Sequence, residues 1–60
     1  MKGRSLYVVQ DMKKYDVFSQ ENLRAIRPGL GLPPKFIDQL IGKRVTKTVK
    51  RGTPLGWELI

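Results

Sequence analysis

Apolar residues along this chain come in short groups that turn-forming residues separate. Residues 5–9 combine β-branched, aromatic and other apolar side chains, which predicts a strand. Residues 23–26 form a second short extended segment. This segment should stop at Arg27, because Pro28 lacks a backbone N–H and disfavours helical angles in the residue before it. Between the two segments, residues 13–16 are typical of a turn and residues 17–18 of a short apolar return.

The second half of the chain contains the one clear helical pattern. Pro34 suits a first helical position, and Gly42 suits a C-terminal cap. We therefore expect one short helix near residues 34–41, preceded at residues 19–22 by a single helical turn that Ser19 would cap. Polar and apolar residues alternate over 43–49, and residues 57–60 close the chain. The expected buried face of the helix consists of Phe36, Ile37, Leu40 and Ile41.

Two stretches of the chain repeat each other at an offset of 37 residues, as in Val8 and Val45 (45 − 8 = 37). The repeat predicts two similar strand–turn–return units related by a pseudo-twofold axis, each too small to bury its own apolar face. Tyr15 stands where the second unit has Gly52, so a turn that requires positive φ would strain Tyr15 by about 1 kcal/mol. Further pairs at this offset are Met12 with Val49, Phe18 with Leu55, Glu21 with Glu58, and Leu23 with Ile60.

The composition limits the chemistry that the chain can perform. Sixty residues make a single domain, 1–60, which buries only about 60% of its unfolded surface. The chain has no Cys and no His, which argues against disulfides and against a zinc or haem site. No apolar run approaches the roughly 20 residues of a membrane span, and none follows the basic N-terminus as in a signal peptide. We therefore expect no membrane partner and a cytoplasmic location.

A net charge of +7 permits attraction to nucleic acid, acidic lipid or an anionic substrate. The twelve basic residues are spread along the chain and form no block of five or six. A solvated basic surface is therefore the favoured interpretation. The five acidic residues are also scattered, which does not suggest a calcium loop.

Proline and glycine are concentrated in residues 24–34, just after the second extended segment. We expect a rigid loop here that holds the Arg27 guanidinium at the end of a strand. Gly29 and Gly31 should supply the positive φ that a folded-back loop needs. The Arg27–Pro28 peptide bond can be cis or trans. The alternative for Arg27 is a surface arginine hydrogen-bonded to local carbonyls. The glycine pair lacks the Lys-Ser/Thr of a phosphate-binding P-loop, so a turn is favoured over a phosphate site.

This chain resembles the C-terminal antifreeze-like (SAF) domain of bacterial sialic acid synthases and related nonulosonic acid synthases. The resemblance covers residues 4–60, and its most specific part is Arg27-Pro28-Gly29-x-Gly31. It implies a mainly β, small β-clip fold, similar to type III antifreeze proteins, with very short strands, one short helix and helical turns. It further implies a domain excised from the C-terminus of a larger TIM-barrel synthase.

The resemblance also implies a function. In such an enzyme the barrel condenses phosphoenolpyruvate with an N-acylated amino sugar, using a divalent metal (Mn or Mg) and catalytic residues that are absent from this chain. The small domain caps the barrel of the partner subunit in a homodimer, and the arginine at the position of Arg27 helps to bind the sugar. Pro28, Gly29 and Gly31 would support that loop. We accordingly expect no catalytic residues, metal ligands or cofactor in this domain, and no activity from it alone.

Other residues and functions have competing interpretations. Arg24 and Arg44 are expected to be solvated or salt-bridged, and Trp57 to plug the core or to lie at an interface. Ice binding is one alternative function, but charged residues in the matching segment, 19–22 with Arg44 nearby, argue against it. A nucleic-acid-binding module is another, but five aromatic residues that mostly fit core positions offer no stacking platform.

Overall fold

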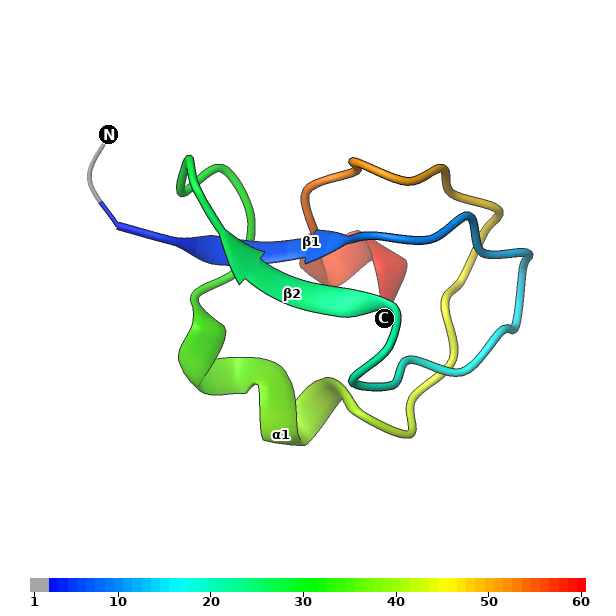
Figure 1. Ribbon diagram of the computed structural model, residues 1–60. Helices are drawn as coiled ribbons and strands as arrows, with labels where there is room; N and C mark the ends of the chain where they lie inside the picture. The colour runs from blue at the N-terminus through cyan, green and yellow to red at the C-terminus, as the bar shows by residue number, and fades with distance from the viewer. Residues whose placement is uncertain (1–2) are drawn as a thin grey trace.

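The fold is built on a two-stranded antiparallel sheet in the centre of the molecule. A computed structural model describes residues 3–60. Strand β1 (Ser5–Val8) pairs with β2 (Leu23–Ile26), with Ser5 opposite Ile26 and Val8 opposite Leu23. Figure 1 shows the two strands crossing the molecule with α1 on one side of them. The sequence therefore predicted both strands, and β2 ends just before Arg27, where Pro28 was expected to stop it.

The expected helix near residues 34–41 is present in two pieces. A 3₁₀ turn, η1 (Pro34–Phe36), leads into a single α-helical turn, α1 (Ile37–Leu40). Ile41 closes that turn by donating its N–H to the Ile37 carbonyl at 3.0 Å, and its own ψ of 129° is already extended. Gly42 follows with φ of 92°, the left-handed conformation expected of a C-terminal glycine.

Backbone hydrogen bonds reproduce the 37-residue repeat. The Val8 N–H donates to the Thr53 carbonyl and the Val45 N–H to the Asp16 carbonyl, both at 2.9 Å. Val45 lies 37 residues after Val8, and Thr53 lies 37 residues after Asp16, so the repeat converts one of these bonds into the other. The prediction of two related units is thus confirmed in the backbone. Further bonds related in this way are Gly52 to Val8 and Tyr15 to Val45, Leu55 to Leu6 and Phe18 to Lys43, and Thr46 to Leu59 and Val9 to Asn22.

The alternating segment 43–49 does not form a strand. It pairs with the first unit only through isolated bridges, Val17 with Arg44 and Met12 with Val49. In the latter bridge the two residues exchange both N–H···O bonds at 2.9 Å. The polar turns of both units leave too few consecutive residues to extend this pairing into a ladder.

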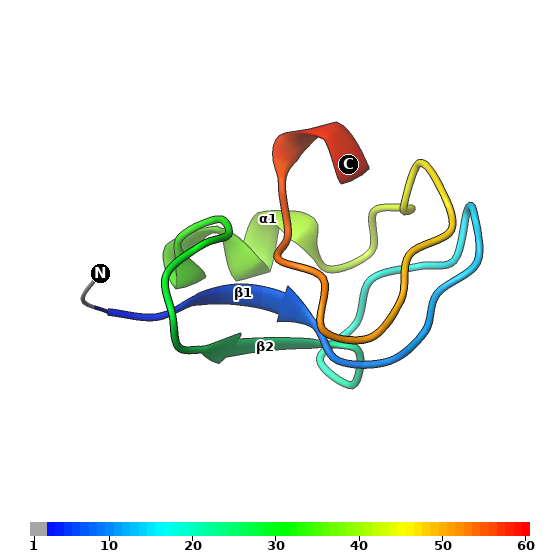
Figure 2. The ribbon, with the colours of Figure 1, turned by 90° about the horizontal axis from the view of Figure 1, so that it is seen from above.

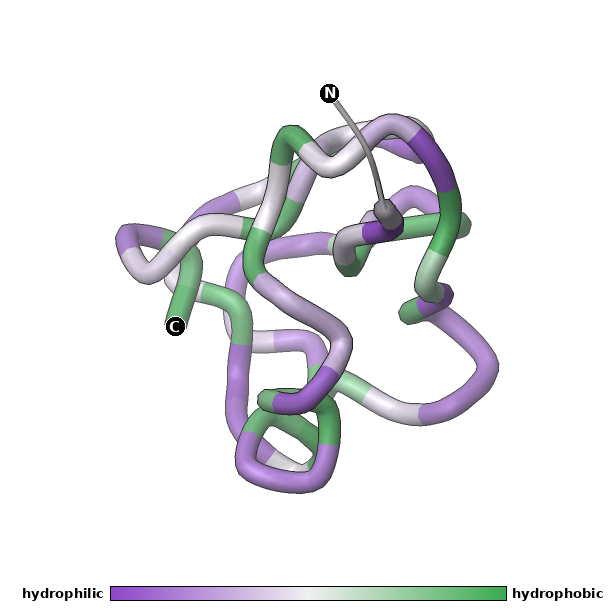
Figure 3. Tube along the Cα trace, turned by 90° about the vertical axis from the view of Figure 1, so that its left-hand side faces the viewer, coloured by the Kyte–Doolittle hydropathy of each residue, from purple (hydrophilic) through white to green (hydrophobic). Residues whose placement is uncertain are grey.

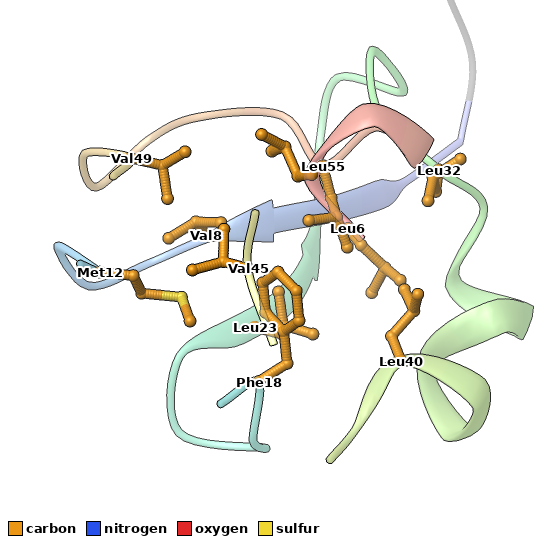
Figure 4. Packing of buried hydrophobic residues seen from close by; sticks show 11 residues of the cluster. Leu6, Val8, Met12, Phe18, Leu23, Leu32, Leu40, Val45, Val49 and Leu55 are labelled. Carbon is orange, nitrogen blue, oxygen red and sulfur yellow. The ribbon is translucent and has the colours of Figure 1, made fainter. Parts of the chain in front are cut away.

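The hydrophobic core forms where the two units meet (Figure 4). Val8 and Val45 are fully buried, as is Phe18, while Leu55 is 1% exposed. Neither unit could bury these side chains without the other. From the predicted helix face, Leu40 is fully buried, and Phe36, Ile37 and Ile41 are partly buried against the core. The molecule is therefore a small, mainly β domain of the β-clip type.

The two ends of the molecule carry different loops. The turn around residues 13–16 lies at one end, and the loop between β2 and η1 lies at the other (Figures 1 and 2). Along the trace in Figure 3, apolar segments are short and alternate with polar ones. Within residues 3–60, no helix has the length and apolar character to cross a membrane.

Trp57 does not plug the core. It lies in η2 (Trp57–Leu59), a 3₁₀ turn near the C-terminus, and its side chain is 54% exposed. The core position in this turn belongs to Leu59, which is 2% exposed. Trp57 instead contacts Phe36 edge to face, with ring centroids 5.2 Å apart and an angle of 72° between the rings.

Candidate functional site

Residues 27–31, which we call the bend, connect β2 to the approach of η1. Arg27 directly follows the last residue of β2, and its peptide bond to Pro28 is cis. The Arg27 side chain is exposed, and no hydrogen bond or ion pair holds it among residues 3–60. The alternative of a guanidinium bound to local carbonyls is therefore not what the structure shows.

Two hydroxyl groups from β1 hold the backbone of the bend. Tyr7 Oη donates a hydrogen bond of 2.7 Å to the Pro28 carbonyl. Ser5 Oγ donates to the same carbonyl at 3.2 Å and accepts the Gly31 N–H at 2.8 Å. Inside the bend, the Leu30 N–H donates to the Pro28 carbonyl at 2.9 Å. Both ends of the bend are thus attached to the same strand.

Gly31 is required for close packing rather than for positive φ. The glycines with positive φ in residues 3–60 include neither Gly29 nor Gly31, so the expectation of positive φ was wrong at both positions. A Cβ atom there would lie 2.6 Å from the Leu6 carbonyl oxygen and 2.8 Å from the Leu55 nitrogen. These are backbone atoms of the two central segments and cannot move aside. The next residue, Leu32, donates its N–H to the Leu55 carbonyl at 2.8 Å and is buried. The bend therefore returns to the core immediately after Gly31.

Two exposed apolar residues lie near Arg27 in the chain. Ile26 is 40% exposed and Leu30 is 67% exposed. A guanidinium is permanently charged and offers several donors in a planar fork, so it can orient a carbonyl, hydroxyl or anionic group but does not exchange protons at neutral pH. The arrangement suits binding and orientation rather than acid–base chemistry.

The other residues considered from sequence lie away from the bend or have ordinary surroundings. Arg44 Nη1 donates to the Tyr15 carbonyl at 3.0 Å, a structural contact with the turn at residues 13–16. Arg24 is exposed in β2. No three acidic side chains gather within residues 3–60, and the chain has no His or Cys, so the described residues offer no set of metal ligands.

Sequence reasoning did not single out Ser5 and Tyr7. Each appeared only as a residue of a predicted strand, because a strand pattern does not say which side chains will meet a distant loop. Their partners in the bend lie 21 to 26 positions further along the chain. Two hydroxyl residues at alternate positions of an otherwise apolar strand were the one available signal, since such residues share a face.

Fold and site together define a class of protein: small β-clip domains that present an arginine on a proline–glycine bend, the backbone of which is held by side-chain hydrogen bonds. The family model of the SAF domain matches residues 3–60, and the chain belongs to this family.

The chain is similar to parts of several curated synthases. It is 48% identical over 53 residues to the pseudaminic acid synthase of Campylobacter jejuni and 42% identical over 53 residues to that of Helicobacter pylori. It is 37% identical over 57 residues to the N,N'-diacetyllegionaminic acid synthase of Legionella pneumophila. These matches cover 88%, 88% and 95% of this chain, but each covers only 16% of the relative. The chain thus corresponds to about a sixth of the length of these enzymes.

Proposed function

We propose that this chain is the accessory substrate-binding domain of a cytoplasmic nonulosonic acid synthase, in which Arg27 helps to bind an N-acylated amino sugar. The observation that carries the proposal is the exposed Arg27 side chain on a bend whose backbone is tied to β1 by the Tyr7 and Ser5 hydroxyls. An arginine without a hydrogen-bond or ion-pair partner among residues 3–60, on a backbone held by side chains, is suited to reach a ligand outside the domain.

The reaction itself would belong to the rest of the enzyme. The chain matches 16% of the length of each curated synthase, which leaves ample sequence for a catalytic barrel. That barrel would hold the divalent metal, bind phosphoenolpyruvate and carry the catalytic residues. The domain described here would therefore contribute substrate binding and no catalytic step.

Arg27 would act by orienting the sugar. Its planar fork of donors would hydrogen-bond the acyl-amino carbonyl or a neighbouring hydroxyl of the sugar. Holding the sugar in a reactive orientation lowers the entropic part of the barrier. Because arginine stays protonated at neutral pH, it would not act as a general acid or base.

The bend would deliver Arg27 into the barrel of the partner subunit in a homodimer. Ile26 and Leu30 flank the arginine and are exposed, so they would contact the wall of the barrel mouth. Arginine is enriched at protein interfaces, and the buried centre of an interface is more apolar than the rest of the surface.

The test is the Arg27→Ala variant of the full-length synthase. Loss of a hydrogen bond from a charged donor costs roughly 1.5–3 kcal/mol, which corresponds to about a 10- to 150-fold decrease in kcat/KM for the sugar. The KM for phosphoenolpyruvate should stay near the wild-type value. Arg24→Ala is the matched control, because it removes another exposed arginine three residues earlier. If Arg27→Ala leaves the kinetics for the sugar unchanged, the proposed role is wrong.

The relatives also support a choice of substrate within the class. Identity is higher to the two pseudaminic acid synthases, at 48% and 42%, than to the N,N'-diacetyllegionaminic acid synthase, at 37%. We infer that the full-length enzyme prefers the precursor of a pseudaminic acid over that of a legionaminic acid or of sialic acid. The test is to measure the turnover rate of the full-length enzyme with each of the three precursor sugars at equal concentration. The pseudaminic acid precursor should be turned over fastest.

A further inference from the structure

We propose that Tyr7, together with Ser5, is a positioning residue for Arg27: it fixes the bend so that the guanidinium points toward the sugar. This inference rests on the function proposed for Arg27. Neither Tyr7 nor Ser5 would touch the substrate, since both side chains are directed to the backbone of the bend.

The first observation is that two side chains converge on one backbone carbonyl. Tyr7 Oη lies 2.7 Å and Ser5 Oγ 3.2 Å from the Pro28 oxygen. A serine hydroxyl can donate and accept at once, and Ser5 also accepts the Gly31 N–H at 2.8 Å. One pair of strand residues therefore holds the bend at two points, before and after its tip.

The second observation is the burial of both faces of β1. Successive side chains of a strand point to opposite faces, so Ser5 and Tyr7 share one face while Leu6 and Val8 share the other. Leu6 and Val8 belong to the hydrophobic core. Ser5 is nevertheless 1% exposed and Tyr7 6% exposed. A buried hydroxyl requires a hydrogen-bond partner, and here the bend provides it for both residues.

The third observation is that Pro28 directly follows Arg27 in the chain. The two residues share a peptide bond, so holding the Pro28 carbonyl limits the movement of the backbone next to Arg27. On the far side of the tip, Gly31 is confined by the Leu6 carbonyl and the Leu55 nitrogen. Loss of the Tyr7 hydroxyl would therefore loosen the bend on the side of Arg27 and leave its other end in place.

The main experiment compares Tyr7→Phe with Tyr15→Phe in the full-length synthase. Both variants remove a tyrosine hydroxyl, but Tyr15 is 60% exposed and lies in the turn at the opposite end of the domain. We expect Tyr7→Phe to raise the KM for the amino sugar by about threefold to tenfold, the factor that one neutral hydrogen bond supplies. The KM for phosphoenolpyruvate should not change, kcat should change less than the KM for the sugar, and Tyr15→Phe should behave as wild type.

Combining Tyr7→Phe with Arg27→Ala separates positioning from a general structural effect. If Tyr7 acts through Arg27, Tyr7→Phe should change the KM for the sugar no further once Arg27 is absent. If the threefold to tenfold effect persists in the double variant, Tyr7 acts in another way and the inference is overturned. It is likewise overturned if Tyr7→Phe has wild-type kinetics while Arg27→Ala is impaired. If Arg27→Ala is itself unimpaired, the proposed function fails first and the inference fails with it.

Amide hydrogen exchange in the 60-residue chain measures the bend without any substrate. In Tyr7→Phe, the Leu30 amide, which donates to the Pro28 carbonyl, should lose more protection than the Gly31 amide, which Ser5 holds, and than the Leu6 and Leu55 amides, which pair with the Leu32 and Leu6 carbonyls. Unchanged exchange in the bend would overturn the inference, whatever the kinetics. Uniformly faster exchange at all four amides would overturn it too, because the hydroxyl would then support the whole fold.

Discussion

Tyr15 and Gly52 occupy equivalent positions in the two units, and both have positive φ, 76° for Tyr15 and 93° for Gly52. Their N–H groups form equivalent hydrogen bonds, to the carbonyls of Val45 and Val8 respectively. The turn thus requires the left-handed conformation in both units, and only the second unit uses the residue that adopts it without strain.

Glycine usually makes a folded protein less stable than alanine does, but at position 15 the left-handed backbone should reverse this order of stability. We expect Tyr15→Gly to be more stable than Tyr15→Ala by about 1 kcal/mol, because both variants remove the ring and only alanine keeps the left-handed penalty. At Gln39, exposed in α1, the order should be the opposite by a similar amount, since helices favour alanine over glycine. Urea unfolding of the four variants measures both differences. Equal stability of the two Tyr15 variants would show that the left-handed turn costs nothing there.

Gly31→Ala should destabilise the domain by about 1–3 kcal/mol, the usual cost of overpacking. The added Cβ would meet backbone atoms of Leu6 and Leu55 at 2.6 and 2.8 Å. Gly56→Ala is the control, because its Cβ would meet only the mobile side-chain end of Glu58, and its φ of −130° suits alanine. Thermal unfolding followed by circular dichroism compares the two. A Gly31→Ala variant as stable as Gly56→Ala would contradict the packing requirement.

Phe18→Ala should unfold both units together. Removing a fully buried phenylalanine costs about 3–5 kcal/mol, which is comparable with the total stability of a domain of 60 residues. Leu55→Ala, at the equivalent position of the second unit, should have the same consequence at a cost of about 2–5 kcal/mol. Two-dimensional NMR spectra of the backbone amides report on each unit separately. A spectrum in which one unit stays folded would disprove the mutual dependence of the units.

Arg27→Ala should leave the stability of the domain within about 0.5 kcal/mol of wild type, since the side chain is exposed and has no partner within residues 3–60. Tyr7→Phe should lower stability by about 0.5–1.5 kcal/mol through loss of one buried hydrogen bond. Urea midpoints of the two variants test this contrast. A large loss of stability in Arg27→Ala would mean that the arginine supports its own fold rather than a ligand.

The local sequence was sufficient for the two strands, for the short helix and for the bend that follows β2. Strands at 5–8 and 23–26 follow from β-branched and apolar residues, and the stop after Ile26 follows from Pro28. The short helix follows from Pro34, the apolar spacing and Gly42. The pseudo-twofold was visible as well, because equivalent core positions require similar side chains.

The errors of sequence reasoning share one cause, which is packing against distant residues. Gly31 was assigned the wrong requirement, because only the folded chain brings the Leu6 carbonyl against it. A core position was one of the two interpretations of Trp57, whereas Leu59 occupies that position and leaves the indole on the surface.

The sequence by itself determined which segments extend, where they turn, the repeat that joins them and the family to which the chain belongs, because these depend on backbone preferences and on residue patterns within short stretches. Only the tertiary structure decided how the bend is held and that Arg27 faces outward without a partner among residues 3–60. The Tyr7 and Ser5 hydroxyls lie more than twenty positions from their partners in the bend. No local preference specifies such contacts; they arise when burial of β1 on both faces leaves two hydroxyls that must find an acceptor.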